Sequence, residues 1–271
     1  MISTAILTRN SPELTTLRIN ELVSHRIPEE EIIVVDAGSD EELVHDHTTI
    51  RVDHLEVLEM GLRFCRGMNL AIDHWLHHSK TAWILLLPAD YEIVAVDLRR
   101  LEAALESVPE AAIVAPLQSN SEQAELIGGA DLKLAWQFDD GPLLVARKLW
   151  EERERAPKST FQLFSHDNFR SILYGLEATL AALFLGFCPA ITSAVETRED
   201  ESYLDRHQVR LRTESREDHL LKARIEMEQR YSVRFGTADP WYLVRAVDSL
   251  FLKFLQENPH LKDLAVKELV R

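Results

Sequence analysis

The chain has 271 residues, of which 46% are hydrophobic, so it can bury a sizeable core and is not a disordered protein. Its 45 acidic residues outnumber 30 Lys and Arg residues, which gives a formal net charge of −15. A field of this sign repels the phosphates of nucleic acid and anionic lipid, so we expect no nucleic-acid partner.

Cysteine usage and hydropathy bear on the compartment. Cys65 and Cys188 stand far apart without metal-ligand spacing, so we expect free thiols and a reducing cytoplasm. No run of about 18 apolar residues is present, which predicts no transmembrane segment. The first residues also lack the basic start and long apolar core of a signal peptide. We therefore expect a cytoplasmic protein.

Strands and helices alternate through the first 117 residues. Apolar runs bounded by turn residues predict buried strands at residues 3–7, 31–36, 49–52, 83–87 and 111–117. Helical patterns cover residues 14–23, 60–78 and 96–107. The segment 60–78 is mostly helical, with a loop expected at 61–69 before the helix. This alternation predicts an α/β fold with a mainly parallel central sheet and helices on both faces.

The pattern changes after residue 119. Shorter strands at residues 126–127, 132–138 and 143–145 predict a small mixed sheet, and a helix rich in Leu and Ala covers 168–187. Beyond residue 198 the charge becomes dense, and we expect amphipathic helices at 214–235, 241–257 and 261–270. We take residues 1–198 as the core domain and 199–271 as a helical C-terminal extension.

An acidic turn follows the strand at 83–87. Asp90 and Glu92 lie just beyond its carboxyl end, where ligands bind in open α/β sheets. Taken alone, the turn also fits an ordinary solvated loop with two surface acids.

Six segments, taken in order, resemble motifs of the inverting glycosyltransferases of family 2, which share the GT-A fold. The similarity covers roughly residues 2–198 and is best at 32–40, Ile-Ile-Val-Val-Asp-Ala-Gly-Ser-Asp, which is similar to the family's Val-Val-Asp-Asn-Gly-Ser-x-Asp stretch. The other five are Thr8-Arg9-Asn10, residues 64–71 at a Gly-x-Asn loop, residues 86–90 at the metal-binding Asp-x-Asp, residues 141–147, and residues 175–180 at a Gly-Glu-Asp-x-Asp-Leu helix start.

The chain departs from the family pattern at its acids. Pro88 replaces the first Asp of the metal motif, so only Asp90 matches. Leu176 and Glu177 stand in place of the Glu-Asp pair, and Thr179 replaces a further Asp. These losses concern catalysis more than fold.

The resemblance implies a nucleotide site with five side chains. Asp36, Thr8 and Asn10 would contact the nucleoside, and Arg66 and Asn69 the ribose or phosphates. The residues themselves leave other interpretations open: Asp36 as a helix cap, Thr8 and Asn10 as a cap before Pro12, and Arg66 as a surface charge.

The resemblance also implies a metal and a base. Asp90 would bind Mg²⁺ or Mn²⁺ with diphosphate oxygens and water, with Glu92 or Asp97 helping through water, although Asp97 also fits a helix cap. Glu177 would be the general base, with Asp167 beside His166 in reserve. Glu177 equally fits a first-turn glutamate favoured by the helix dipole.

The function implied is metal-assisted, inverting transfer of a sugar from a nucleotide-sugar, with UDP favoured, to a glycan, lipid-linked or protein acceptor in bacterial glycan biosynthesis. The alternative is an inactive GT-A-like binding or scaffold protein, motivated by Pro88 and Leu176. The apolar side of the extension favours either a homo-oligomer or packing over the acceptor site. Arg206, Arg210 and Arg212 leave peripheral membrane contact open.

Overall fold

The computed structural model describes residues 2–52, 64–119, 125, 127–136, 141–151, 163–164, 174–200, 216–231 and 240–266. Its strands are β1 (Ile2–Thr8), β2 (Ile32–Asp36), β3 (Thr48–Arg51), β4 (Trp83–Pro88), β5 (Tyr91–Val96), β6 (Ala111–Gln118), β7 (Leu132–Leu134), β8 (Leu143–Ala146) and β9 (Cys188–Glu199). Its α-helices are α1 (Pro12–Ser24), α3 (Phe64–His78), α4 (Leu98–Ser107), α6 (Lys148–Glu151), α7 (Tyr174–Phe184), α9 (Arg216–Tyr231) and α10 (Pro240–Glu257).

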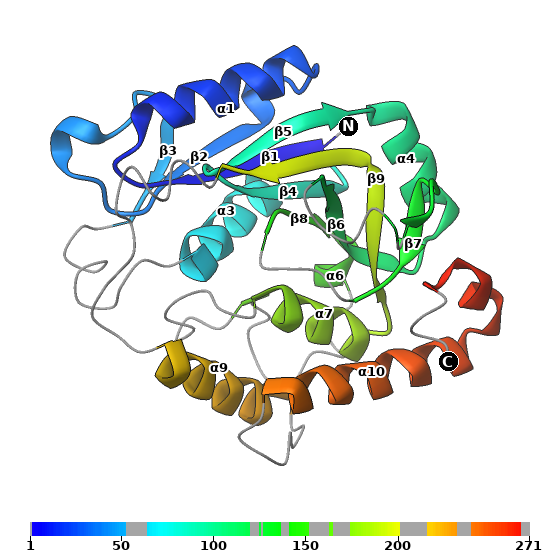
Figure 1. Ribbon diagram of the computed structural model, residues 1–271. Coiled ribbons are helices and arrows are strands. Elements are labelled where there is room, and N and C mark those ends of the chain that lie inside the picture. Colours follow the sequence, from blue (N-terminus) through cyan, green and yellow to red (C-terminus); the bar gives the residue numbers. More distant parts are fainter. Residues whose placement is uncertain are drawn as a thin grey trace.

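The described strands form one sheet in the order β3-β2-β1-β4-β8-β6-β9-β5, with β7 paired to β9. The pairs β3-β2, β2-β1 and β1-β4 are parallel, as is β6-β9, and the remaining pairs are antiparallel. Every residue of β1 is buried, as expected for a strand with helices on both faces. The predicted α/β fold is thus confirmed, and the sheet curls between its helices (Figure 1).

Two strands were missing from the sequence prediction. The expected acidic loop after residue 87 is only a two-residue turn, because β5 begins at Tyr91 and pairs antiparallel with β9. In β5, Tyr91 and Ile93 are buried while Val94 and Ala95 are exposed, so it is a short edge strand with one buried face. Strand β9 is long and shifts register against both β6 and β5, which lets it bridge the two halves of the curled sheet.

Helix α1 covers the free edge of β5. The guanidinium Nη1 of Arg18 donates to the carbonyl of Tyr91 at 3.1 Å and to Glu21 Oε2 at 2.7 Å. Glu21 in turn accepts from the backbone N–H of Ile93 at 3.2 Å. These side chains satisfy backbone groups that an open edge strand would otherwise expose.

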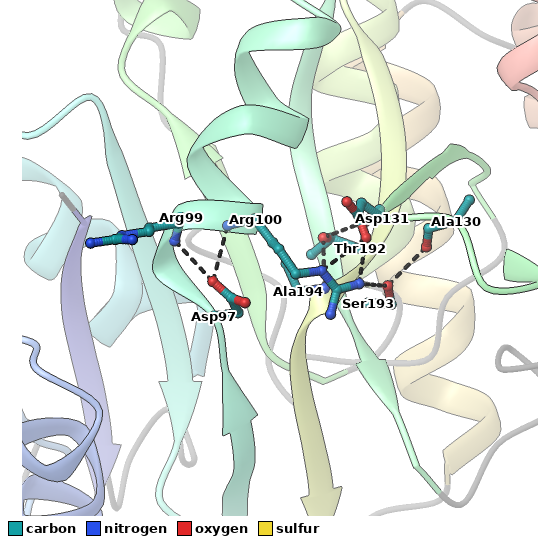
Figure 2. Close-up of polar contacts among 8 residues, drawn as sticks. All are labelled: Asp97, Arg99, Arg100, Ala130, Asp131, Thr192, Ser193 and Ala194. Atoms are coloured by element: carbon teal, nitrogen blue, oxygen red, sulfur yellow. Dashed lines mark hydrogen bonds and ion pairs between the residues drawn. The ribbon is translucent and has the colours of Figure 1, made fainter.

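Asp97 caps the N-terminus of α4, as one interpretation of the sequence proposed. The Asp97 carboxylate accepts from the backbone N–H groups of Arg99 and Arg100, each at 3.1 Å. Figure 2 shows Arg100 reaching across to Asp131, with Nε 3.0 Å from Oδ1, beside the Ser193 hydroxyl of β9. Both members of this ion pair are about half exposed, so it joins α4 to the end of the sheet from the surface.

The C-terminal helices α9 and α10 pack on α7 (Figure 1). Met227, Tyr231, Val247 and Phe251 are buried in the same apolar cluster as the sheet. Within the expected last helix at 261–270, residues 261–264 belong instead to a 3₁₀ segment, Pro259–Leu264, after which the Val266 N–H donates to the Leu134 carbonyl at 3.0 Å. Residues 267–270 of that prediction lie outside the described residues. No helix in the described ranges is long and apolar enough to cross a bilayer. The boundary at residue 198 remains a prediction.

Candidate functional site

The carboxyl ends of three parallel strands meet at one edge of the sheet. Thr8 of β1 lies opposite Asp36 of β2, and Leu7 lies opposite Pro88 of β4. The Ala37 N–H donates to the Thr8 carbonyl at 2.8 Å, and the Ala89 N–H donates to the Leu7 carbonyl at 2.9 Å. The turns after β1, β2 and β4 are therefore held side by side, where an open α/β sheet binds its ligand.

Asp36 is fully buried and organises the turn that follows it. Its carboxylate accepts from the backbone N–H groups of Gly38 (3.1 Å) and Ser39 (2.9 Å) and from the Ser39 hydroxyl. Arg51 Nε lies 3.8 Å from Asp36 Oδ1, and Gly38 has a φ of 78°, which glycine adopts at little cost. Asp36 therefore holds a turn and does not cap a helix, because no helix begins at Ser39 and the next 3₁₀ segment, Glu41–Leu43, has Asp40 as its N-cap.

Asn10 joins the first turn to the second. Its side chain donates to Asp40 Oδ2 at 3.2 Å and accepts from the Asp40 N–H at 2.8 Å, while its own N–H donates to the Ser39 hydroxyl at 2.8 Å. The Thr8 hydroxyl is buried and accepts from Thr15 Oγ1 at 2.8 Å. Asn10, Ser39 and Asp40 therefore present one connected polar rim.

Arg66 and Asn69 lie in the first turns of α3, so the expectation of a loop at these residues was wrong. The Asn69 amide donates to the Phe164 carbonyl at 2.8 Å and accepts from the Phe164 N–H at 3.2 Å, which commits it to the backbone. Gly67 between them faces the sheet: an added Cβ would lie 2.5 Å from Leu7 Cδ1. This close approach sets the first turn of α3 against Leu7 and Val35, near the ends of β1 and β2, and Arg66 in that turn is half-buried.

Asp90 lies directly after β4, and its carbonyl accepts from the Asp200 N–H at 2.7 Å. Burial raises the pKa of its carboxyl to about 6, and the nearby Glu199 carboxylate adds to the effect. The neighbouring Glu92 pairs instead with Arg198, whose Nε lies 3.0 Å away.

The side chains present do not by themselves make a metal centre. In the parts of the chain that the structure describes, no three His, Cys, Asp or Glu side chains are grouped so that they could hold an ion. Asp90 would be a single ligand, and Mg²⁺ or Mn²⁺ would need diphosphate oxygens and water for the rest of its shell. We therefore derive no catalytic step through a metal.

Glu177 lies in the first turn of α7 and is only 1% exposed. Its Oε1 accepts from Arg230 Nη1 of α9 at 2.7 Å. Helix α7 contacts α3 through Tyr174, whose ring stacks on Phe64 with centroids 4.2 Å apart. The reserve base Asp167 and its neighbour His166 fall outside the described residues.

Three residues at or near the site were not expected from the sequence: Ser39, Arg230 and Arg18. The charge of Arg18 acts to lower the pKa of Asp90, against the effect of burial. The Ser39 hydroxyl belongs to the best-matching motif and could have been included. Arg230 gave no signal, because it lies far in sequence from Glu177. Arg18 has a local partner in Glu21, but its approach to Tyr91 left no signal.

Two surface cavities lie away from this edge. One, of about 510 Å³, is lined by Ile2, Trp83 and Lys148 at the opposite ends of the strands. The other, of about 560 Å³, lies between α1 and His45 to His47. Neither is lined by the site residues expected from the sequence.

Known proteins are similar to this chain in structure rather than in sequence. No protein-family model matches it, and no curated protein matches its sequence. The structure of S. aureus TarS 1-349 in complex with UDP-GlcNAc aligns with a TM-score of 0.51 at 15% identity, over 94% of this chain and 71% of that one. In a longer TarS structure the alignment spans 42% of that chain.

A second neighbour is the mannosyltransferase PcManGT from Pyrobaculum calidifontis in complex with GDP-Man and Mn²⁺, with a TM-score of 0.48 at 16% identity, over 93% of this chain and 74% of that one. At these identities the comparison establishes the architecture alone. With the sheet order and strand-end edge described above, the TarS alignment at a TM-score of 0.51 shows that the chain has the GT-A-like fold of glycosyltransferases.

Proposed function

We propose that this protein is an inverting glycosyltransferase that moves a sugar from a nucleotide-sugar, with UDP favoured, to an acceptor hydroxyl in bacterial glycan biosynthesis. One observation carries the proposal: the polar turns after β1, β2 and β4 converge at a single edge of a GT-A-like sheet. A glycan, a lipid-linked glycan or a protein would serve as the acceptor. We place the reaction in the cytoplasm and include peripheral contact with the membrane in the proposal.

The side chains have separate roles in this scheme. Thr8, Asn10 and Asp36 bind the nucleoside. The hydrogen bonds within the turn after Asp36 already hold these groups in place. Arg66 faces the diphosphate, and Asn69 fixes the backbone near Phe164. Rigid placement of this kind lowers the barrier by holding the donor in line with the acceptor.

In the chemical step the acceptor oxygen attacks the anomeric carbon. A new carbon–oxygen bond forms on one face while the bond to the diphosphate breaks on the other, which inverts the configuration. Glu177 takes the proton from the acceptor hydroxyl, and Asp167 is the alternative base. The departing diphosphate keeps the bonding electron pair, and Arg66 stabilises its charge.

A second function, a non-catalytic binding or scaffold protein of the same fold, is favoured by a specific set of contacts. The side chains of Asp36, Asn69 and Glu177 are all engaged by the protein itself. Pro88 also removes one of the metal ligands that the family resemblance implies.

Calorimetric titration with UDP, GDP and UDP-GlcNAc, each with and without Mn²⁺, tests both candidates. Nucleotide binding that strengthens with Mn²⁺ and weakens in Asp90→Asn is expected for the transferase. Absence of binding at millimolar nucleotide would rule it out. Release of UDP from UDP-GlcNAc that is lost in Glu177→Gln would eliminate the scaffold reading.

A further inference from the structure

The contact between Arg230 and Glu177 links the C-terminal helices to the proposed base. Arg230 Nη1 lies 2.7 Å from Glu177 Oε1, and the two side chains are 20% and 1% exposed. The carboxylate is thus buried and its cation is the more accessible partner. A buried carboxylate needs such a partner to stay ionised, because removal from water disfavours the charge.

The end of α9 is fixed on α7 by more than this pair. Tyr231 is buried; its hydroxyl lies 3.5 Å from the Glu177 carbonyl, and its ring lies 5.2 Å from that of Phe184 at the other end of α7. The Arg230 guanidinium lies 5.4 Å from the centroid of the Tyr231 ring. Arg230 is therefore placed by packing along α7, which limits how far its guanidinium can move.

We infer that Arg230 is a positioning residue for Glu177, so that α9 completes the acceptor side of the site. This inference rests on the proposed glycosyl transfer, in which the acceptor proton passes to the Glu177 carboxylate. Arg230 holds one carboxylate oxygen and supplies a permanent positive charge, while its own protons stay on the guanidinium. The part of the chain beyond residue 198 then belongs to the catalytic unit.

Variants of Arg230 test this role. Release of UDP from UDP-GlcNAc with water as acceptor is followed across pH for wild type, R230M, R230Q and R230K. Without the cation, a buried carboxylate binds its proton more readily. We expect kcat of R230M and R230Q to fall by about tenfold or more, and the acid limb of the kcat profile to move to higher pH. KM for the donor should stay within about twofold, and R230K should recover most of the loss.

Arg100→Met is the matched control, because it removes an Arg–carboxylate pair that is about half exposed (Figure 2) and includes none of the proposed site residues. Thermal unfolding checks that each variant is folded, and R230Q carries the test if R230M does not fold. If E177Q is inactive but folded R230M or R230Q keeps the kcat and the acid limb of wild type, the role of Arg230 is overturned. The proposed function is not affected by that result. Wild type that binds UDP-GlcNAc without turning it over would overturn the proposed function, and this inference with it.

Discussion

Burial and Glu199 raise the pKa of Asp90 to about 6 from an ordinary 3.8. A carboxyl with a raised pKa stabilises the fold while it is protonated; this contribution is complete below pH 3.8 and is lost as pH rises through 6. Above that range the ionised Asp90 lowers stability. Charges kept at such a cost are common at functional sites, where their chemistry is needed.

Asp90→Asn should therefore stabilise the protein at neutral pH. The amide cannot ionise, so we expect a gain of about 1–2 kcal/mol at pH 7.5, after allowance for partial solvent screening, and little difference at about pH 3.5, below the ordinary pKa. Urea unfolding at the two pH values measures it. Asp263→Asn, which changes an exposed carboxyl in the 3₁₀ segment Pro259–Leu264, is the control and should show no such pH dependence. An equal effect of Asp90→Asn at both pH values would contradict the assignment.

At the scale of elements, the covered edge of β5 predicts a large effect from one helix residue. Arg18→Met removes a buried guanidinium from the Tyr91 carbonyl and leaves Glu21 beside β5 without its cation. We expect a loss of about 2–4 kcal/mol in the free energy of unfolding. Removal of the exposed pair by Arg100→Met should cost far less, because water and salt screen the two charges. Similar losses for the two variants, measured by urea unfolding, would show that the β5 edge does not depend on Arg18.

Much of the sheet was predictable because its strands are continuous apolar runs. The runs that became β1, β2, β4 and β6 could each be read from their own residues. Strand β5 was missed because Glu92 interrupts it, and β9 because Pro189, Thr192 and Ser193 resemble loop residues. Gly67 suggested a loop because glycine is common in loops. In the structure it lies in α3, where its missing side chain lets the helix approach β1.

The candidate site was predictable only in part. Residues at strand ends could be brought together from the alternation of strands and helices, because parallel strands end at one edge. The partners could not: Arg18, Arg51 and Arg230 approach their carboxylates through tertiary packing, which leaves no pattern in a single sequence. The roles assigned to the site residues remain proposals.

For the whole molecule, the shared core predicts one unfolding transition. Phe251 of α10 is fully buried in the apolar cluster that includes the sheet. Phe251→Ala should lower the free energy of unfolding by about 3–5 kcal/mol. Trp75 and Trp150 report from the sheet side of that cluster, and Trp136 reports from its bond to Asp248 of α10, so tryptophan fluorescence and circular dichroism should shift together in one step. Two separate steps in either signal would instead show that the extension unfolds as an independent unit.

The pairing of β5 with β9 also sets an order of events during synthesis. Tyr91 pairs with Glu199, so β5 waits for its sheet partner until more than a hundred further residues have left the ribosome. At about 5–20 residues per second, that interval lasts several seconds. Helix α1 is made long before, and Arg18 and Glu21 can hold β5 during the wait. The surroundings of Asp90 would then form late on the nascent chain, once Glu199 and Asp200 arrive.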